Sequence, residues 1–92
     1  MKQYIIIFPT ESQAKYWFNR AIKVLYNAVI RVNNTTKTIE FGGFKLRFMA
    51  EIYYLKYGDG IRAEKELGGW WFGNKLDEYE AKLKELQNEQ TR

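Results

Sequence analysis

The sequence predicts a small α+β domain, and three features of its 92 residues point to that class. An apolar run at residues 4–8 is typical of a buried strand, and the residues after it repeat at helical spacing. Residues 37–49 alternate around two glycines, as a β-hairpin does. We therefore expect a strand–helix–strand–hairpin order in a mixed sheet of three to four strands. One long amphipathic helix packs on one face, and a second helix ends the chain.

The first strand and helix have clear boundaries in the sequence. Residues 4–8 are apolar without alternation, which is typical of an interior strand covered on both faces. Pro9 ends this strand because it has no N–H to donate to a neighbouring strand. Thr10 and Gln13 form a capping box that begins the helix. The apolar stripe of this helix, with Phe18 as the expected core anchor, comprises Ala14, Trp17, Phe18, Ala21, Val24, Leu25 and Ala28.

A second strand is expected at residues 29–32, followed by a hairpin. Gly42 and Gly43 form the two-residue loop that type I′ or II′ hairpins use. The expected register pairs two aromatic rings, two opposite charges and two aliphatic side chains: Phe41 with Phe44, Glu40 with Lys45 and Ile39 with Leu46. One face of the hairpin is then apolar, and the other is polar.

The second half of the chain is less regular. Residues 50–57 either extend the last hairpin strand or form a short helix that ends at a glycine. A loop is expected at 58–60, and one or two helical turns at 61–67. Asn74 is the expected N-cap of the last helix, and the tail at 87–92 is expected to fray.

The composition removes several classes of function. The chain has no cysteine and no histidine, which excludes thiolate or imidazole metal ligands and every nucleophile–histidine scheme. The carboxylates lack the spacing of a metal loop or of an acid–base pair. We therefore expect no cofactor, no metal and no enzymatic activity. The N-terminal apolar run is too short for a membrane span, so we expect one cytoplasmic domain over residues 1–92 with no membrane association.

Positive charge is concentrated in the first part of the chain. The net charge is +4, with +6 over residues 1–57 and −2 over residues 58–92. This basic surface is either an ordinary solvated surface or a site for nucleic acid or an acidic partner. The polar hairpin face lacks aromatic residues, so duplex binding is favoured over single-strand stacking. The candidate binding residues are Lys15, Arg20, Lys23, Arg31, Lys45 and Arg47.

An aromatic cluster of Trp70, Trp71 and Phe72 lies between glycines. It is either a lid over the core or a partner-binding anchor, a role in which Trp is over-represented. Neighbours on an extended segment point in opposite directions, so one Trp is expected to be buried and the other exposed. The last helix carries a Leu/Tyr stripe that docks on its own domain or forms a homodimer.

Part of the chain resembles phage terminase and helicase motors. The residues concerned are 5–10, with Gln13 and Ala14, then the hairpin at 38–48 and residues 60–63. Together they resemble the segment that follows the nucleotide loop in those motors, over about residues 4–64. The phosphate-binding loop and the strand-borne Asp-Glu of the family are missing. The resemblance therefore implies a related ancestry and a phage-type small protein, without ATPase activity or a catalytic residue.

These features predict a non-enzymatic binding protein of a phage or mobile element that occludes a macromolecular surface. An inhibitor of a host nucleic-acid-handling protein, such as a nuclease or a CRISPR effector, fits this description. The partner is then a host protein or a protein–nucleic-acid complex. The alternative is duplex nucleic-acid binding by the basic helix and the hairpin face.

Overall fold

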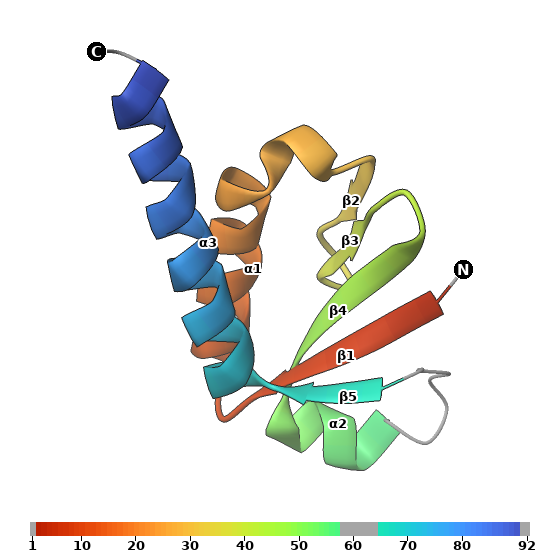
Figure 1. The fold of residues 1–92 in the computed structure, drawn as a ribbon. Helices are drawn as coiled ribbons and strands as arrows, with labels where there is room; N and C mark the ends of the chain where they lie inside the picture. Colours follow the sequence, from red (N-terminus) through yellow and green to blue (C-terminus); the bar gives the residue numbers. More distant parts are fainter. Residues whose placement is uncertain (1, 58–64, 91–92) are drawn as a thin grey trace.

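A five-stranded mixed sheet forms the centre of the structure, a computed structural model that describes residues 2–57 and 65–90, with side chains as far as Gln87. The strand order is β2-β3-β4-β1-β5 (Figure 1). β1 pairs in parallel with both β4 and β5, whereas β3 pairs antiparallel with β2 and β4. The strands are β1 (Lys2–Phe8), β2 (Arg31–Asn33), β3 (Thr38–Glu40), β4 (Phe44–Ala50) and β5 (Lys65–Gly68).

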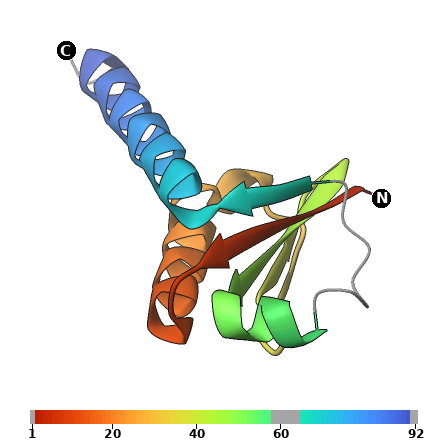
Figure 2. The ribbon, with the colours of Figure 1, turned by 90° about the horizontal axis from the view of Figure 1, so that it is seen from below.

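Helices cover both faces of this sheet. α1 (Glu11–Val24) and α3 (Gly69–Gln90) lie side by side on one face, and the short η1 (Tyr26–Ala28) follows α1 (Figures 1 and 2). α2 (Glu51–Tyr57) lies on the other face, where the Tyr54 hydroxyl donates to Glu66, the β5 residue opposite Ile5. No helix in the described part of the chain is long and apolar enough to cross a membrane.

The start of α1 confirms the expected N-cap. The Thr10 hydroxyl accepts a hydrogen bond from the backbone N–H of Gln13 at 3.2 Å. α1 ends at Val24, where the N–H of Leu25 donates to the carbonyl of Ala21 at 2.9 Å. The apolar stripe thus continues into η1 after the α-helix has ended. Phe18 is 3% exposed, which confirms its place in the core.

Phe48 is the centre of the main core, between the sheet and the α1–α3 pair. It is 1% exposed, and its ring contacts those of Phe8, Phe18 and Phe72 at centroid distances of 6.1, 5.7 and 5.3 Å. The opposite face of β1 presents Ile5, which is 1% exposed. β1 is therefore an interior strand with buried residues on both faces, as its unbroken apolar sequence predicts.

The hairpin register is confirmed in every pair. Glu40 lies opposite Lys45 and Ile39 opposite Leu46. The N–H of Phe41 donates to the carbonyl of Phe44 at 2.8 Å, and the two rings stack with centroids 4.9 Å apart. The turn type differs from the expectation, because neither Gly42 nor Gly43 has the positive φ that a type I′ or II′ turn requires.

The second half of the chain differs from the prediction. The sheet has five strands rather than three or four, because residues 65–68 form a strand beside β1 instead of helical turns. Ala50 ends β4 and residues 51–57 form the short helix α2, and α3 begins at Gly69 rather than after Asn74. The loop expected at 58–60, residues 61–64 and the end of the tail at 91–92 lie outside the described residues.

Two glycines explain how α3 approaches the rest of the fold so closely. A Cβ added at Gly69 would lie 2.5 Å from Phe8 Cδ1 and 2.8 Å from the carbonyl oxygen of Ile7. A Cβ added at Gly73 would lie 3.0 Å from the Trp17 ring. The helix start is therefore set by tight packing against β1 and α1, a cause that the local sequence pattern does not reveal.

Candidate functional site

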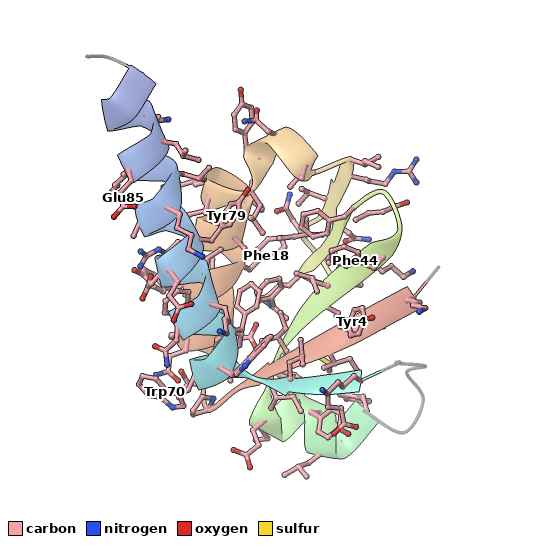
Figure 3. All side chains as sticks on the ribbon, in the orientation of Figure 1. Tyr4, Phe18, Phe44, Trp70, Tyr79 and Glu85 are labelled. Atoms are coloured by element: carbon pink, nitrogen blue, oxygen red, sulfur yellow. The ribbon has the colours of Figure 1, made fainter. Side chains whose placement is uncertain are left out.

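Two exposed tryptophans lie at the first turn of α3. Trp70 is 76% exposed and Trp71 is 53% exposed, and Figure 3 shows Trp70 at the N-terminal end of α3. Both lie on a helix rather than an extended segment, so the expected alternation of one buried and one exposed indole is absent. Phe72, the third member of the cluster, is 8% exposed and packs on Phe48. We call Trp70, Trp71 and the adjacent Pro9 the tryptophan end.

A small cavity adjoins Trp70. It has a volume of about 100 Å³, and its walls include Pro9, Gln13, Trp17 and Asn74. The side-chain oxygen Oε1 of Gln13 is buried and has no hydrogen-bond partner among the described residues. The tryptophan end thus combines two exposed indoles with an adjoining recess, and hot-spot residues of protein interfaces cluster around such pockets.

Arg20 joins α1 to α3 through two carboxylates. Its Nη2 lies 2.8 Å from Asp77 Oδ1 and donates to Glu80 Oε2 at 2.7 Å. Nη1 donates to the Tyr16 hydroxyl at 3.2 Å, and the guanidinium lies 5.2 Å from the Trp17 ring centroid. The hydrogen bond to Glu80, more than any other contact, raises the pKa of Arg20 above its ordinary value. Arg20 is therefore a link between helices.

Glu80 is the acidic partner in this link. The hydrogen bond from Arg20 lowers the pKa of the Glu80 carboxyl below its ordinary value, and the nearby Lys84 lowers it further. A lowered folded-state pKa means that the ionised form stabilises the fold. This stability is present above the unfolded-state pKa and is lost as the pH falls through the folded-state pKa.

We expect Glu80→Gln to flatten the acid side of the pH–stability profile. The melting temperature of the parent should fall more steeply than that of the variant between about pH 5 and pH 3, because only the parent must protonate Glu80. Thermal melts followed by circular dichroism across that range measure the difference. Glu78→Gln is the matched control, since Glu78 pairs with Lys75 at 3.6 Å on the exposed side of the same helix. Parallel profiles for parent and Glu80→Gln would contradict the proposed role of the link.

The six basic candidates do not form one surface. Lys15 and Lys23 are exposed on α1, with Arg20 partly buried between them. Arg31, Lys45 and Arg47 lie on the opposite face of the sheet, where Glu40 stands between Arg31 and Lys45 in the strand register. The six residues thus form two groups of three on opposite faces of the sheet. In the first group, Arg20 is already paired with two carboxylates.

The apolar stripe of the last helix is partly used by the fold. Leu76 is 3% exposed within the core, and Leu83 is partly buried. Tyr79 and Leu86 are 47% and 55% exposed, and α3 extends past the end of α1 (Figures 1 and 2). A homodimer through this part of the helix stays a proposal.

Comparison of the chain with protein-family models, with curated proteins and with solved structures gave no match. Among the described residues, no group of three or more acidic side chains is placed to hold a metal ion. The site therefore has to be interpreted from its own geometry.

Two features escaped the sequence analysis. The acids that hold Arg20 lie three residues apart on one helix, a spacing that places both on one face. The spacing of Asp77 and Glu80 is visible in the sequence, but the sequence does not show that Arg20 on α1 faces them. The second feature is a larger cavity of about 330 Å³ between β4, α2 and the β2–β3 loop. It went unnoticed because residues 50–57 were ambiguous between strand and helix.

Proposed function

We propose that the chain is a non-enzymatic binding protein whose tryptophan end covers a surface of a protein partner. The observation that carries this proposal is the exposure of Trp70 and Trp71, 76% and 53%, in the first turn of α3. Exposed indoles rank among the most frequent energetic anchors of protein interfaces, and a helix presents them without ordering a loop.

The charges around the tryptophan end support a protein partner rather than a polyanion. Arg20 is compensated by Asp77 and Glu80, and Lys75 lies 3.6 Å from Glu78. Depletion of free charge around aromatic anchors is typical of the centre of a protein interface. The recess beside Trp70 would accept a small apolar side chain of the partner.

The partner class that we propose is a host protein that handles nucleic acid, in the setting of a phage or mobile element. The net charge of +4 supports this choice, because such proteins present acidic or nucleic-acid-bearing surfaces. Direct duplex binding is the second proposal, and it is supported by the exposed Lys15 and Lys23 on α1.

A capture experiment separates the two proposals. The tagged protein is incubated with a lysate of the organism that encodes it, with and without nuclease treatment. A partner retained after nuclease treatment supports protein binding. Binding to labelled duplex that weakens steeply between 50 and 200 mM salt, over about three orders of magnitude for many phosphate contacts, supports the second proposal instead.

We expect Trp70→Ala and Trp71→Ala to leave the melting temperature nearly unchanged and to weaken binding of the captured partner by about 2 kcal/mol or more each. The reason is that neither indole is buried in the free protein. Isothermal titration and thermal melts on both variants measure the two effects. Leu55→Ala is the matched control, because Leu55 is 77% exposed on α2. Normal affinity in both Trp variants would place the interface elsewhere.

A further inference from the structure

The cavity between β4, α2 and the β2–β3 loop lies where two neighbouring parallel strands are followed by helices on opposite faces of the sheet. β1 leads into α1 on one face, and its neighbour β4 leads into α2 on the other. In open sheets with helices on both faces, ligands bind outside the carboxyl ends of the strands at such a point. A cavity of about 330 Å³ lies here, at the lower end of the roughly 300–1,000 Å³ range of small-molecule pockets.

Each wall of this cavity comes from a different element. α1 supplies Glu11, and the C-terminal part of β4 supplies residues 47–50. α2 supplies Tyr53 and Tyr57, which are 48% and 55% exposed and lie one helical turn apart. The β2–β3 loop supplies residues 35–37.

The loop wall is held in place by its own hydrogen bonds. Asn33 Oδ1 accepts from the N–H groups of Thr35 and Thr36 at 3.0 and 3.1 Å. Lys37 has a φ of 54°, a left-handed conformation that is uncommon for a residue with a side chain. The carbonyl of Lys37 accepts from the N–H of Phe48 at 2.9 Å, which ties the loop to β4. The conformation of the β2–β3 loop is therefore fixed by contacts within the protein and does not need a ligand.

Arg47 is the uncompensated charge of the cavity. Its Nε is buried and has no hydrogen-bond partner within the part of the chain that the structure describes. Lys37 forms an ion pair with Glu11, so these two lining charges offset each other. In the strand register Arg47 is flanked by Thr38 and Ile5, and Glu66 lies one strand further away. A buried guanidinium N–H without an acceptor is costly, and a carboxylate or a phosphate is the group that the fork of donors on arginine fits.

We propose that this cavity is a binding site for a small planar molecule that carries an oxyanion. The guanidinium of Arg47 binds the phosphate or carboxylate group, and the Lys37–Glu11 ion pair lies in the cavity lining without adding a net charge. The rings of Tyr53 and Tyr57 cover the planar part of the ligand. This site is independent of the tryptophan end and would be present whatever partner that end binds.

The test follows the Nε–Hε signal of Arg47 by NMR during titration with three probes: inorganic phosphate, phenyl phosphate and benzoate. Ionic strength is held constant with chloride, because unspecific attraction is screened by salt. We expect a saturable shift with a dissociation constant in the millimolar range or below. Phenyl phosphate should bind at least tenfold more tightly than inorganic phosphate, and its comparison with benzoate identifies the preferred oxyanion. Equal affinity for the two phosphates would overturn the role of the tyrosines.

Two matched variants decide the role of Arg47. Arg47→Met should abolish the saturable shifts of the backbone amides in α2, and Arg47→Lys should weaken binding at least tenfold while keeping the charge. Lys45→Met should bind normally, because Lys45 lies two residues earlier on the same face of β4 and outside the cavity lining. No saturable shift in the parent, or equal losses in Arg47→Met and Lys45→Met, would overturn the proposal. If Arg47→Met fails to fold, the titration of the parent protein still shows whether the cavity binds the probes.

Discussion

Phe48→Ala is expected to lower the free energy of unfolding by about 3–5 kcal/mol, which is most of the stability of a domain this small. Phe48 is 1% exposed and touches the rings of Phe8, Phe18 and Phe72, so its removal leaves a cavity bordered by β1, α1 and α3 at once. The three rings come from different elements and cannot all move inward to fill it. Urea unfolding followed by circular dichroism measures the loss.

Phe44→Ala is the matched control for this prediction. Phe44 lies four residues earlier on β4, is 37% exposed and stacks on Phe41 at the rim of the core (Figure 3). We expect a loss of about 1 kcal/mol, because mainly the ring–ring contact and a partly exposed surface are affected. Similar losses in the two variants would show that Phe48 is not the centre of the core.

Gly69→Ala is expected to destabilise the fold by about 3 kcal/mol, at the upper end of the cost of overpacking. The new Cβ would lie 2.5 Å from Phe8 Cδ1 and 2.8 Å from the carbonyl oxygen of Ile7. The Phe8 ring is held in the core, and the Ile7 backbone is held by its pairing with β4 and β5, so neither can move away freely. The gain from replacing glycine in a helix, about 1 kcal/mol, is smaller.

Gly68→Ala tests the same chemical change one residue earlier. Nothing lies within 4 Å of a Cβ added at Gly68, and its φ is not positive. We expect an unchanged or slightly raised melting temperature, since alanine restricts the unfolded chain. Thermal melts of the two variants side by side isolate the steric contact. A Gly69→Ala variant as stable as Gly68→Ala would refute the close packing of α3 on β1.

Local sequence patterns predicted most of the first half of the fold, although β2 begins at Arg31 rather than at Val29. The strand at β1, the Thr10 cap, the burial of Phe18 and the register across the glycine loop each depend on residues close in the chain. β5 was missed because its four residues are mostly exposed and polar, and only its place beside β1 makes it a strand. The start of α3 was missed because it depends on the fit of Gly69 against Phe8, a contact between distant residues.

The candidate site was predicted only in part for a related reason. The exposure of tryptophans was expected for one of the pair, but the helix turns both Trp70 and Trp71 to solvent and Phe72 to the core. Arg20 was read as a free positive charge, because the sequence does not say that Asp77 and Glu80 face it. Lys15 and Lys45 lie on opposite faces of the sheet because of its topology. A count of charges along the chain carries no information on that topology.

The central position of β1 has a consequence for synthesis on the ribosome. β1 is made before both of the strands that flank it, since Lys2 pairs with Phe44 and Tyr4 pairs with Lys65. The most apolar segment of the chain therefore waits with unpaired edges until β4 and then β5 have emerged from the ribosome. Contacts of this sequence separation slow folding, and an unpaired apolar strand is a substrate for chaperones and for aggregation. The early helix at α1, with its own N-cap, can cover one side of that strand during the wait, which leaves its two edges as the last part of the molecule to be protected.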